Sequence, residues 1–545
     1  MQTVAVRDPS VLADLRMLLM GAFDPLTGFM GALTYESVVE GMRLEDGRPW
    51  PIPIVFPYDG SESLKLGTTL RLETSQGSHV ATLEVEEVFK PDLAREFEKV
   101  LGCSGPQDYK CHPWSTHLLS TYDVNKLVYV GGKVTAGPVS LRPLAFQGLH
   151  LQPEETKTIE GPLIGMQTRN PLHGCHLELL KRAMRSVGGA KVLLQPVVGP
   201  TQPGDVPPDV RIKCYEAAIK TLSPEAQARV TLCLLPLAMR MAGPREALWH
   251  ALIRKNYGCT HFVVGRDHAG PSTKRGDGSG WYGGLEAQDL AASFQEEIGI
   301  QIIRVGHLHY VPSASAYLAN GEFGEGEPTK RISGTQLRTM LKEGKEVPSW
   351  FSPPEVVDIL QAYYGRGGLC VYFTGLSGAG KSTLAEGLAE RLKEVLPSSK
   401  AITVLDGDIV RTHLSKGLGF SAEDRSTNVR RIGYVASEIV KHGGIVLVAN
   451  IAPFTADRLA NRASVEAVGR YVQVHVSTSL EVCEKRDVKG LYAKVRAGEI
   501  KLFTGVSSPY EDPEEGVDMG PSDFTLDTAA SLDASLTSLM KHLGY

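Results

Sequence analysis

The sequence predicts an α/β protein built from several domains. The chain has 545 residues, which is too long for one hydrophobic core and favours roughly three or four domains. From about residue 156, short apolar runs alternate with helical stretches, which indicates a parallel sheet. Near residue 375 a glycine-rich loop lies between an apolar run and an amphipathic helix, which indicates a second α/β domain.

The composition is that of an ordinary globular protein, with 42% hydrophobic and 22% charged residues and a formal net charge of −5. This balance argues against general nucleic-acid binding. The eight cysteines form no CxxC pair, so we expect a reduced, cytoplasmic protein without structural zinc. The N-terminal residues include Asp8 and Asp14, and no apolar run is long enough to span a bilayer. We therefore expect neither secretion nor membrane insertion.

Residues 1–155 are expected to form a mostly β domain with a helical start. They are rich in Pro and Gly and carry short β-like runs at 51–56, 69–72 and 127–130. The motif Gly21–Met30 is interpreted as a packed turn, and by itself it indicates no chemistry.

Residues 156–315 are expected to form the first α/β domain. Its candidate strands end at Thr168, near Val198, at Pro236, at Gly265 and at Val305. Ligands of such sheets bind beyond the carboxyl ends of the strands, and two of these ends carry reactive side chains.

The first of these ends is the segment Gln167–His176. Asn170 suits a helix N-cap and the proline after it suits the first helical position, which would place His173 and His176 on one face of the first turns. Arg169 and the helix N-terminus would then make an anion site, with both histidines as donors to a phosphate. A capped helix with two surface histidines is the alternative, which the Gln-x-Arg-Asn-Pro context disfavours.

The second end is the segment Phe262–Pro271. Its apolar strand runs directly into Arg266, Asp267 and His268, and the small residues that follow let a ligand approach the backbone. A structural ion pair between Arg266 and Asp267 is the alternative. We favour a functional site because both segments leave the same predicted sheet edge.

Residues 316–365 contain a charged, glycine-rich turn at 320–327 and a helical end, so we expect a small α/β linker domain. The junction Gly365–Gly368 then leads into the last predicted domain, residues 366–545.

The loop Gly375–Ser382 predicts a phosphate-binding site in this last domain. It lies between the apolar run Leu369–Thr374 and a helical segment. Its glycines let backbone N–H groups converge on phosphate oxygens, Lys381 reaches the β- and γ-phosphates, and Ser382 can ligate Mg²⁺. An ordinary glycine-rich turn is the alternative, which the register of strand, helix, Lys and Ser disfavours.

Two segments that follow the loop suit a phosphate acceptor. A second apolar strand, 401–405, ends at Asp406-Gly407-Asp408, where a carboxylate can act as general base or hold Mg²⁺ through water. The basic and aromatic segment 418–433 suits an anionic acceptor that carries a base. A structural cap and a solvated charged helix are the respective alternatives.

Several separated motifs resemble those of ATP sulfurylase (sulfate adenylyltransferase). They are QTRNPLHGCH at 167–176, MRMAGPREA at 239–247, GRDHAGP at 265–271 and ISGT at 332–335. The likeness extends from GAFDPLTGFM at 21–30 to WFSPPE at 350–355 and covers essentially residues 1–365. It implies a PUA-like N-terminal domain and a Rossmann-like HxxH nucleotidyltransferase domain. It also implies that sulfate attacks the α-phosphorus of ATP, giving adenosine 5′-phosphosulfate (APS) and pyrophosphate.

This resemblance implies a role for each matching residue. Sulfate would be held by Gln167, Arg169 and the backbone N–H of Ala269, and the catalytic strip would be Thr168, Arg169 and Asn170. His173 and His176 would bind the phosphates of the leaving group. The nucleotide would be seated by Gly265, Arg266, Asp267 and His268, with Leu308 as a backbone contact to the adenine.

Residues 369–545 resemble adenylylsulfate kinase, on the glycine loop, the Asp-Gly-Asp segment, EVCEKRDVKGLY at 481–492 and FTG at 503–505. The resemblance implies a P-loop kinase that phosphorylates the 3′-hydroxyl of APS, with Lys381 and Asp408 as catalytic residues. ATP would contact Gly375, Ser377, Gly378, Ala379, Gly380, Lys381, Ser382 and Thr383, with Mg²⁺ at Ser382. APS would contact Asp408, Arg411, Phe420, Arg425, Asn428, Ile451, Ala452, Lys489, Phe503 and Thr504.

The sequence departs from both families at a few positions. Gln195 and Gln202 stand where relatives commonly have His and Lys, which is expected to weaken anion binding or to shift the preferred direction. Ile409 stands where Asn is usual, which is expected to loosen contacts to the acceptor. Ala452 replaces a serine that some relatives phosphorylate, so phosphate transfer should be direct.

We therefore predict a bifunctional sulfate-activating enzyme, with ATP, sulfate, APS, pyrophosphate and Mg²⁺ as its ligands and with homo-oligomers expected from the families. Two alternatives remain open at this point. The sulfurylase could run in the ATP-forming direction, or the C-terminal domain could be a regulatory binding module, as degenerate kinase-like domains are in some fungal sulfurylases.

Overall fold

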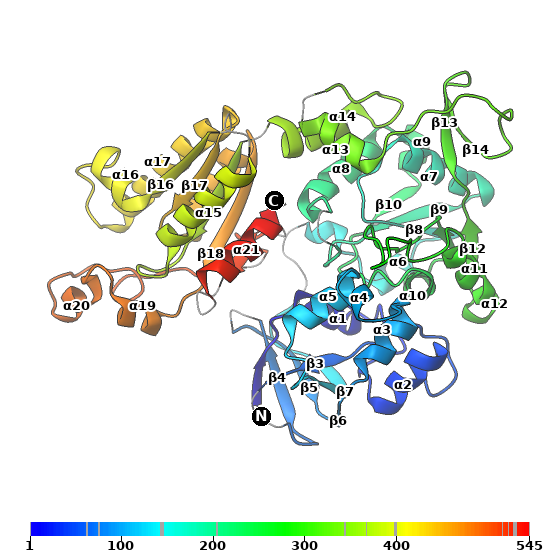
Figure 1. Cartoon of the computed structure of the whole chain (residues 1–545), viewed down its shortest axis with the longest axis horizontal. Coiled ribbons are helices and arrows are strands. Elements are labelled where there is room, and N and C mark those ends of the chain that lie inside the picture. Colours follow the sequence, from blue (N-terminus) through cyan, green and yellow to red (C-terminus); the bar gives the residue numbers. More distant parts are fainter. Residues whose placement is uncertain are drawn as a thin grey trace. The chain divides into compact units, whose positions relative to one another are not determined.

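A computed structural model describes residues 2–543, except for 61–63, 75–76, 142–145, 203–204, 343–344, 367, 397–400, 515, 521–522 and 527–530. The chain forms two compact units (Figure 1). The first contains Met1–Val206 and Tyr215–Arg331, and the second contains Pro207–Cys214 and Ile332–Tyr545. Gly367, in the predicted junction between domains, lies outside the described residues.

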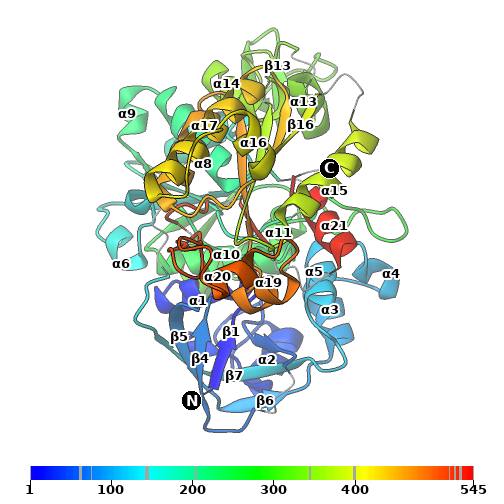
Figure 2. The ribbon, with the colours of Figure 1, turned by 90° about the vertical axis from the view of Figure 1, so that its left-hand side faces the viewer.

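The N-terminal part of the first unit is a sheet whose strands lie side by side in both views (Figure 1, Figure 2). Its path is β1 (Gln2–Ala5), β4 (Thr69–Glu73), β5 (His79–Glu84), β7 (Val128–Ala136) and β2 (Gly28–Phe29), with β3 (Phe56–Tyr58) and β6 (Glu87–Phe89) also paired to β7. In β4, Leu70 and Leu72 are buried and alternate with half-buried residues, as expected for a sheet with one face on the core. The helices here are α1 (Pro9–Leu19), α2 (Ala32–Gly41), α3 (Leu93–Leu101), α4 (Pro106–Tyr109) and α5 (Pro113–Thr121).

The rest of the first unit is built on a parallel sheet. Its order is β10 (Val230–Leu232), β9 (Lys191–Pro196), β8 (Leu163–Thr168), β11 (His261–Val264) and β12 (Gln301–Arg304). The central strands are almost continuously buried, as expected when helices cover both faces. The flanking helices are α6 (Pro153–Thr156), α7 (Gly174–Ser186), α9 (Pro224–Gln227), α10 (Pro244–Asn256), α11 (Glu286–Ser293) and α12 (Gln295–Ile298). Helix α8 (Pro208–Lys220) is divided between the two units after Cys214. The predicted parallel α/β architecture is confirmed.

A hairpin follows this sheet, formed by β13 (Leu308–Val311) and β14 (Ala316–Ala319). Arg182 of α7 fixes the hairpin, because its guanidinium donates to the Tyr317 carbonyl at 3.1 Å and to the Glu322 carboxylate at 2.7 Å. Two helices of the second unit come next, α13 (Gly334–Lys342) and α14 (Pro354–Gln361).

The second unit contains another parallel sheet. Its order is β16 (Ile402–Asp406), β17 (Ile445–Ala449), β15 (Leu369–Thr374), β18 (Arg470–Val476) and β19 (Phe524–Leu526). Val371 and Phe373 of β15 belong to the core beneath α15 (Lys381–Val395) and α21 (Leu532–Leu543), whereas Cys370 and Tyr372 belong to the core beneath α17 (Ala422–Lys441). The remaining helices are α16 (Gly407–His413), α18 (Thr455–Glu466), α19 (Leu480–Arg486) and α20 (Leu491–Arg496). Side chains of one strand thus build a core on each face of the sheet.

All eight cysteines are free thiols. Among the described residues, no helix combines the length and the apolar character needed to cross a membrane.

Candidate active sites

The two loops singled out in the first unit leave neighbouring strands at the same edge of the sheet. β8 and β11 pair in parallel, and they end at Thr168 and Val264. The segments Gln167–His176 and Gly265–Ala269 therefore begin side by side, at the edge where ligands of parallel sheets bind.

The first loop starts with a tight turn closed by its own side chains. The Thr168 hydroxyl donates to the Asn170 carbonyl at 2.9 Å and accepts from the Asn170 N–H at 3.0 Å. Arg169 leaves this turn and pairs with Asp205, at 2.5 Å between Nη1 and Oδ1. The guanidinium predicted to bind sulfate is thus paired with a carboxylate, and Thr168 shapes the turn.

The helix after this loop begins later than the sequence suggests. We expected Asn170 to be the N-cap, but α7 starts at Gly174 and its N-cap is His173, so this prediction is wrong. The reason is the turn between Thr168 and Asn170, which engages the backbone of Asn170 and leaves the helix to be capped by a pair of histidines. The His173 N–H donates to Nδ1 of His176 at 3.1 Å, which closes a capping box.

This cap fixes the chemistry of the histidine pair. Because Nδ1 of His176 accepts a hydrogen bond, a neutral His176 carries its proton on Nε2 and can donate from there. His173 is buried, and burial together with the neighbouring His176 lowers the pKa of His173 to about 3. Burial would lower the pKa of His176, but the neighbouring Cys175 outweighs it and raises that pKa. His173 is therefore the neutral ring of the pair.

The second loop has a strained backbone that turns its residues to the sheet edge. Asp267 and Ala269 have φ values of 50° and 57°, in the left-handed region that side chains rarely adopt. Arg266 and Asp267 are exposed, whereas His268 turns inward and its Nε2 lies 3.0 Å from Nδ1 of His250 on α10. Burial and the nearby His250 lower the pKa of His268 to about 3.

The two glutamines that depart from the family pattern have structural partners. Gln195 is fully buried at the end of β9, and its Nε2 lies 3.5 Å from the Cys233 sulfur. Gln202 accepts from the Ser272 N–H at 3.1 Å and so ties the segment after β9 to the segment after the second loop. Leu308 lies half-buried at the start of β13.

In the second unit, the glycine loop between β15 and α15 has the conformation that its sequence predicts. Gly375, Gly378 and Gly380 have φ values of 147°, 78° and 103°, and a Cβ at Gly375 would lie 2.6 Å from the Val476 carbonyl oxygen. Lys381 is buried and donates to the carbonyls of Gly375 and Leu376 at 2.9 and 2.7 Å. Burial lowers the pKa of Lys381 to about 8.

Asp406, which was not among the predicted site residues, contributes a carboxylate beside this loop. Asp406 ends β16, and its Oδ2 accepts from the Ser382 hydroxyl at 2.6 Å. Burial raises the pKa of Asp406, but hydrogen bonds from Ser382 and from the Asp408 N–H outweigh it, so the pKa is lowered. Asp408 is exposed and pairs with Lys489, from a segment far along the chain. The sequence predicts an acidic residue at the end of this strand. It does not predict whether Asp406 or Asp408 faces Ser382.

Several residues implied for the acceptor form contacts within the second unit. The Arg411 guanidinium lies over the Phe420 ring at 4.5 Å, and Phe420 is 62% exposed. Arg425 donates to the Thr504 hydroxyl at 2.7 Å and to the Leu502 carbonyl at 2.8 Å. Asn428 is buried and its Oδ1 has no hydrogen-bond partner among the described residues. Phe503 stacks edge-on against Tyr492 at 4.9 Å.

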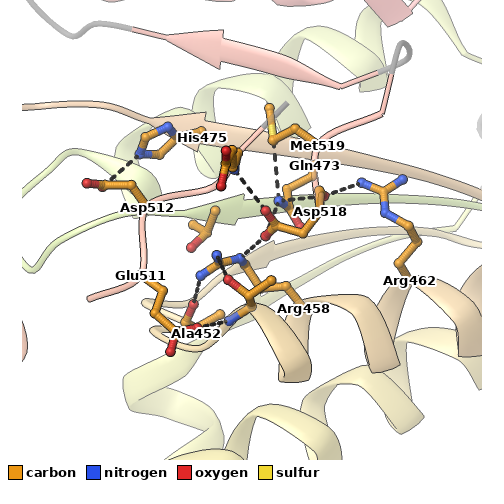
Figure 3. Close-up of polar contacts among 12 residues, drawn as sticks. Ala452, Arg458, Arg462, Gln473, His475, Glu511, Asp512, Asp518 and Met519 are labelled. Carbon is orange, nitrogen blue, oxygen red and sulfur yellow. Dashed lines mark hydrogen bonds and ion pairs between the residues drawn. The ribbon is translucent and has the colours of Figure 1, made fainter. Parts of the chain in front are cut away.

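The loop after β17 contributes backbone rather than side chains. The Ile451 carbonyl accepts from Thr374 at 2.6 Å, and Ala452 is fully buried with a φ of 44°. Arg458 holds this loop by donating to the Ala452 carbonyl at 2.8 Å (Figure 3). Because the Ala452 side chain is fully buried, residue 452 can contact an acceptor only through its backbone.

Arg458 is itself neutralised by Asp518, and both side chains are fully buried. Gln473 on β18 donates to the Asp518 carboxylate at 3.4 Å, and the Glu514 N–H donates to its other oxygen at 2.9 Å (Figure 3). The segment that follows the predicted acceptor residues is therefore anchored to α18 by a buried ion pair and to β18 by the hydrogen bond from Gln473.

Comparison with known proteins adds family matches to this geometry. Three family models match the chain: a PUA-like domain at residues 2–137, ATP-sulfurylase at 148–363 and adenylylsulphate kinase at 367–518. A sulfate adenylyltransferase of Gibberella zeae is 43% identical over 515 residues, which is 92% of this chain and 87% of the relative. One of Neurospora crassa is 42% identical over 517 residues, with the same two shares.

A solved structure also matches along the whole length. It is described as a hexameric APS kinase from Thiobacillus denitrificans, and the match has a TM-score of 0.55 and 29% sequence identity. The match covers 100% of this chain and 93% of that one.

Proposed function

The chain belongs to the sulfate adenylyltransferase family and combines an ATP-sulfurylase domain with an adenylylsulphate kinase domain, and we propose that it activates sulfate in two consecutive steps. In the first, a sulfate oxygen bonds to the α-phosphorus of ATP while the bond to the β-phosphate breaks, giving APS and pyrophosphate. In the second, the 3′-hydroxyl of APS bonds to the γ-phosphorus of another ATP and ADP leaves.

The sulfurylase step needs no protein nucleophile, because sulfate attacks directly. Gln167, Arg169 and the Ala269 N–H hold sulfate in this proposal, and Thr168 and Asn170 fix the turn that presents them. His176 donates from Nε2, together with His173, to the phosphates that leave. The residues act by positioning two anions and by stabilising the charge that develops on the leaving group.

The nucleotide of this step is seated by the second loop, through Gly265, Arg266, Asp267 and His268, with Leu308 as a further contact. The support is positional, since this loop begins beside the sulfate loop on the neighbouring strand. An ATP that lies across both loops has its α-phosphate at the boundary between them, which is where sulfate must attack.

The kinase step uses the glycine loop as the cradle of the second ATP, with contacts from Gly375 through Thr383. Lys381 exchanges its two loop carbonyls for phosphate oxygens, and the Asp408 carboxylate accepts the proton of the 3′-hydroxyl. The acceptor is bound by Arg411, Phe420, Arg425, Asn428, Lys489, Phe503 and Thr504, and by the backbone of the Ile451-Ala452 loop. Since position 452 has no hydroxyl, transfer is direct.

Mg²⁺ fits the oxygen donors beside the loop. The Ser382 hydroxyl and the Asp406 carboxylate lie 2.6 Å apart, and Mg²⁺ is usually held by one or two such groups together with substrate phosphates. Bound there, Mg²⁺ would neutralise charge on the β- and γ-phosphates.

Two further proposals concern the state of the protein. We expect a homo-oligomer, which the hexameric description of the matched kinase structure supports. We also propose a cytoplasmic location, which the eight free thiols support.

The observation that carries the two-step proposal is the intact Lys381 and Ser382–Asp406 arrangement in the same chain as a complete sulfurylase strip. A binding module has no need of a phosphate-loop lysine together with a serine that is paired with a carboxylate. The test follows pyrophosphate release from ATP and sulfate, and then ADP release on addition of APS. Absence of ADP release at saturating Mg-ATP would reduce the C-terminal domain to a binding module.

A further inference from the structure

A row of three ionisable side chains lies on the buried face of α10, beneath the sulfurylase site. Glu246, His250 and Arg254 are spaced four residues apart, so they lie one above the other on the helix, and all three are fully buried. α10 carries this row in the unit that holds both sulfurylase loops. Burial of such a row is costly unless each member has a partner.

Each member of the row contacts a different segment of the site. The two carboxylate oxygens of Glu246 accept from the backbone N–H groups of Arg240 and Ala242, at 3.0 and 2.9 Å. Nδ1 of His250 lies 3.0 Å from Nε2 of His268.

At the far end of the row, Arg254 donates to the Gln195 carbonyl at 3.3 Å, at the end of β9. One helix face thus braces the MRMAGP segment, the nucleotide loop and the end of the strand beside β8.

The direction of the hydrogen bonds along this row follows from Glu246. Burial raises the pKa of Glu246, and the backbone N–H groups of Ala242 and Arg240 oppose that shift. A carboxyl group whose two oxygens both accept backbone N–H groups is suited to the ionised form, since a protonated oxygen would lose one of these bonds. Nε2 of His250 lies 3.3 Å from Oε1 of Glu246 without forming a hydrogen bond among the described residues, and a carboxylate at that distance favours a proton over a lone pair on this nitrogen. The other nitrogen of a neutral His250, Nδ1, is then an acceptor, so the proton shared with His268 belongs to Nε2 of His268.

Burial, reinforced by the Arg254 cation, keeps both rings neutral. This cation lies one turn from His250, and burial together with this charge lowers the pKa of His250 well below its usual value. The same two causes act on His268, together with the neighbouring His250. A second proton on either ring would place a further positive charge beside a buried guanidinium.

We propose that Glu246 and His250 are positioning residues of the sulfurylase reaction that hold His268 as its Nε2–H tautomer and so present Nδ1 of His268 to the nucleotide as a hydrogen-bond acceptor. This inference rests on the proposed role of His268 in seating ATP. An ionised phosphate has no proton to donate to Nδ1 of His268. In this form His268 therefore accepts a hydrogen bond from the nucleoside, either from a ribose hydroxyl or from the adenine amino group.

The tautomer is measured directly on the intact protein. Histidine-selective ¹⁵N labelling of the full chain gives the shifts of both ring nitrogens, and the variants His268→Gln and His250→Asn assign the two rings by loss of their signals. We expect both rings to be neutral Nε2–H tautomers without titration between about pH 6 and about pH 9. A His268 ring protonated on Nδ1, or on both nitrogens, overturns the proposal whatever the kinetics show.

Two replacements of His250 separate the acceptor from the volume that it fills. Asn places its side-chain oxygen near the position of Nδ1 and can still accept from His268, whereas Leu fills the space without an acceptor. We expect His250→Leu to raise the KM for ATP in the sulfurylase reaction by about tenfold or more, the size of one lost buried hydrogen bond, and His250→Asn to restore most of this loss. Equal losses in the two variants would mean that only packing matters and would overturn the proposal.

The kinase reaction of the same samples is the internal control. A His250→Leu chain that retains kinase turnover but melts at a lower temperature with an unchanged KM for ATP in the sulfurylase reaction would assign His250 a purely structural role. If the variant does not fold, the ¹⁵N measurement on the unsubstituted chain still decides.

Nucleotide analogues identify the donor and separate this inference from the proposed site. ATP analogues without the 2′-hydroxyl, the 3′-hydroxyl or the adenine amino group are compared in the unsubstituted chain and in His250→Leu. We expect one analogue to lose about tenfold in kcat/KM in the former and little further in the latter. Equal losses in both chains overturn the acceptor role of His268. Unaltered ATP kinetics in His268→Ala would instead contradict the proposed seating of the nucleotide, independently of the tautomer.

Discussion

Substitution of Asp518 by Asn measures how much the buried Arg458–Asp518 ion pair contributes to the stability of the kinase domain. The change keeps the shape of the side chain but leaves the Arg458 guanidinium charged and without its anion in a site where both side chains are fully buried. Removal of one partner of such a pair costs about 3–5 kcal/mol. For a domain of this size about 1 kcal/mol corresponds to about 2–4 °C, so we expect the melting temperature of the kinase domain to fall by about 6–20 °C.

The chain offers a matched control in Asp533, which pairs with Arg391 but is 85% exposed. Asp533→Asn removes an ion pair of the same chemistry at the surface, and surface pairs contribute about 0–1 kcal/mol. Its expected shift is therefore at most about 4 °C. The contrast between the two variants reports burial, because the chemical change is identical.

Calorimetry of the full chain measures both shifts, and residual activity after heating assigns them to a domain. In Asp518→Asn, ADP formation from APS should be lost at temperatures where pyrophosphate release is retained. Because Arg458 also holds the Ala452 carbonyl, the KM for APS should rise at temperatures where the variant is still folded. A shift no larger than that of Asp533→Asn, or joint loss of both activities, would refute the reasoning.

Three further outcomes are expected. Lys381→Ala should abolish kinase turnover and leave sulfurylase turnover largely intact, as two separate assays would show; joint loss would contradict the independence of the two sites. Kinase kcat/KM for ATP should decline as the pH rises through about 8, because burial lowers the pKa of Lys381 to about 8 and only the protonated amine binds phosphate, whereas a profile flat to well above that pH would contradict this. Asp205→Ala should lower the KM for sulfate severalfold, because Arg169 can then bind sulfate without first breaking its ion pair with Asp205. A raised KM for sulfate would instead show that Asp205 orients the guanidinium.

The features that depend on strand order and loop chemistry could be predicted from the sequence. Two apolar runs end at Thr168 and Val264, and each is followed by polar side chains that can bind a ligand. These runs do lie on neighbouring parallel strands, and the glycine loop does join β15 to α15. These patterns are local, so each is visible in a short window, and the carboxyl ends of parallel strands meet without further information.

The start of α7 could not be predicted in the same way. Asn170 and the following proline are good signals for a helix start, but the Thr168 hydroxyl competes for the backbone of Asn170 and forms a turn instead. His173 is an unusual cap, and its preference arises only because His176 lies where its ring can accept the His173 N–H. Residue propensities do not contain this reciprocal contact.

The row on α10 was present in the sequence as an acid, a histidine and an arginine at four-residue spacing. That spacing places the three on one helix face, but it is equally typical of a solvated face that carries ion pairs. The face that turns inward is decided by the sheet beneath it, where Gln195 and His268 supply partners from distant parts of the chain. The choice between Asp406 and Asp408 was hidden for the same reason.

Three of the cations that the proposed reactions need share one property, which is that each has an oxygen partner within the protein. Arg169 pairs with Asp205, Lys381 with two loop carbonyls, and Lys489 with Asp408. Lys381 is buried, and a buried cation without a partner would be costly, so its two carbonyl contacts stabilise the protein, whereas the exposed pair of Lys489 and Asp408 contributes little. A substrate anion then binds by replacing the protein oxygen that pairs with the cation. Only the difference in free energy between these two contacts contributes to the affinity for the substrate. An oxygen of the leaving phosphate, which gains its charge only in the transition state, benefits most from such exchange, because the ground state gains little. Preformed partners therefore keep substrates and products from binding too tightly at two sites that must each release an anion in every turnover.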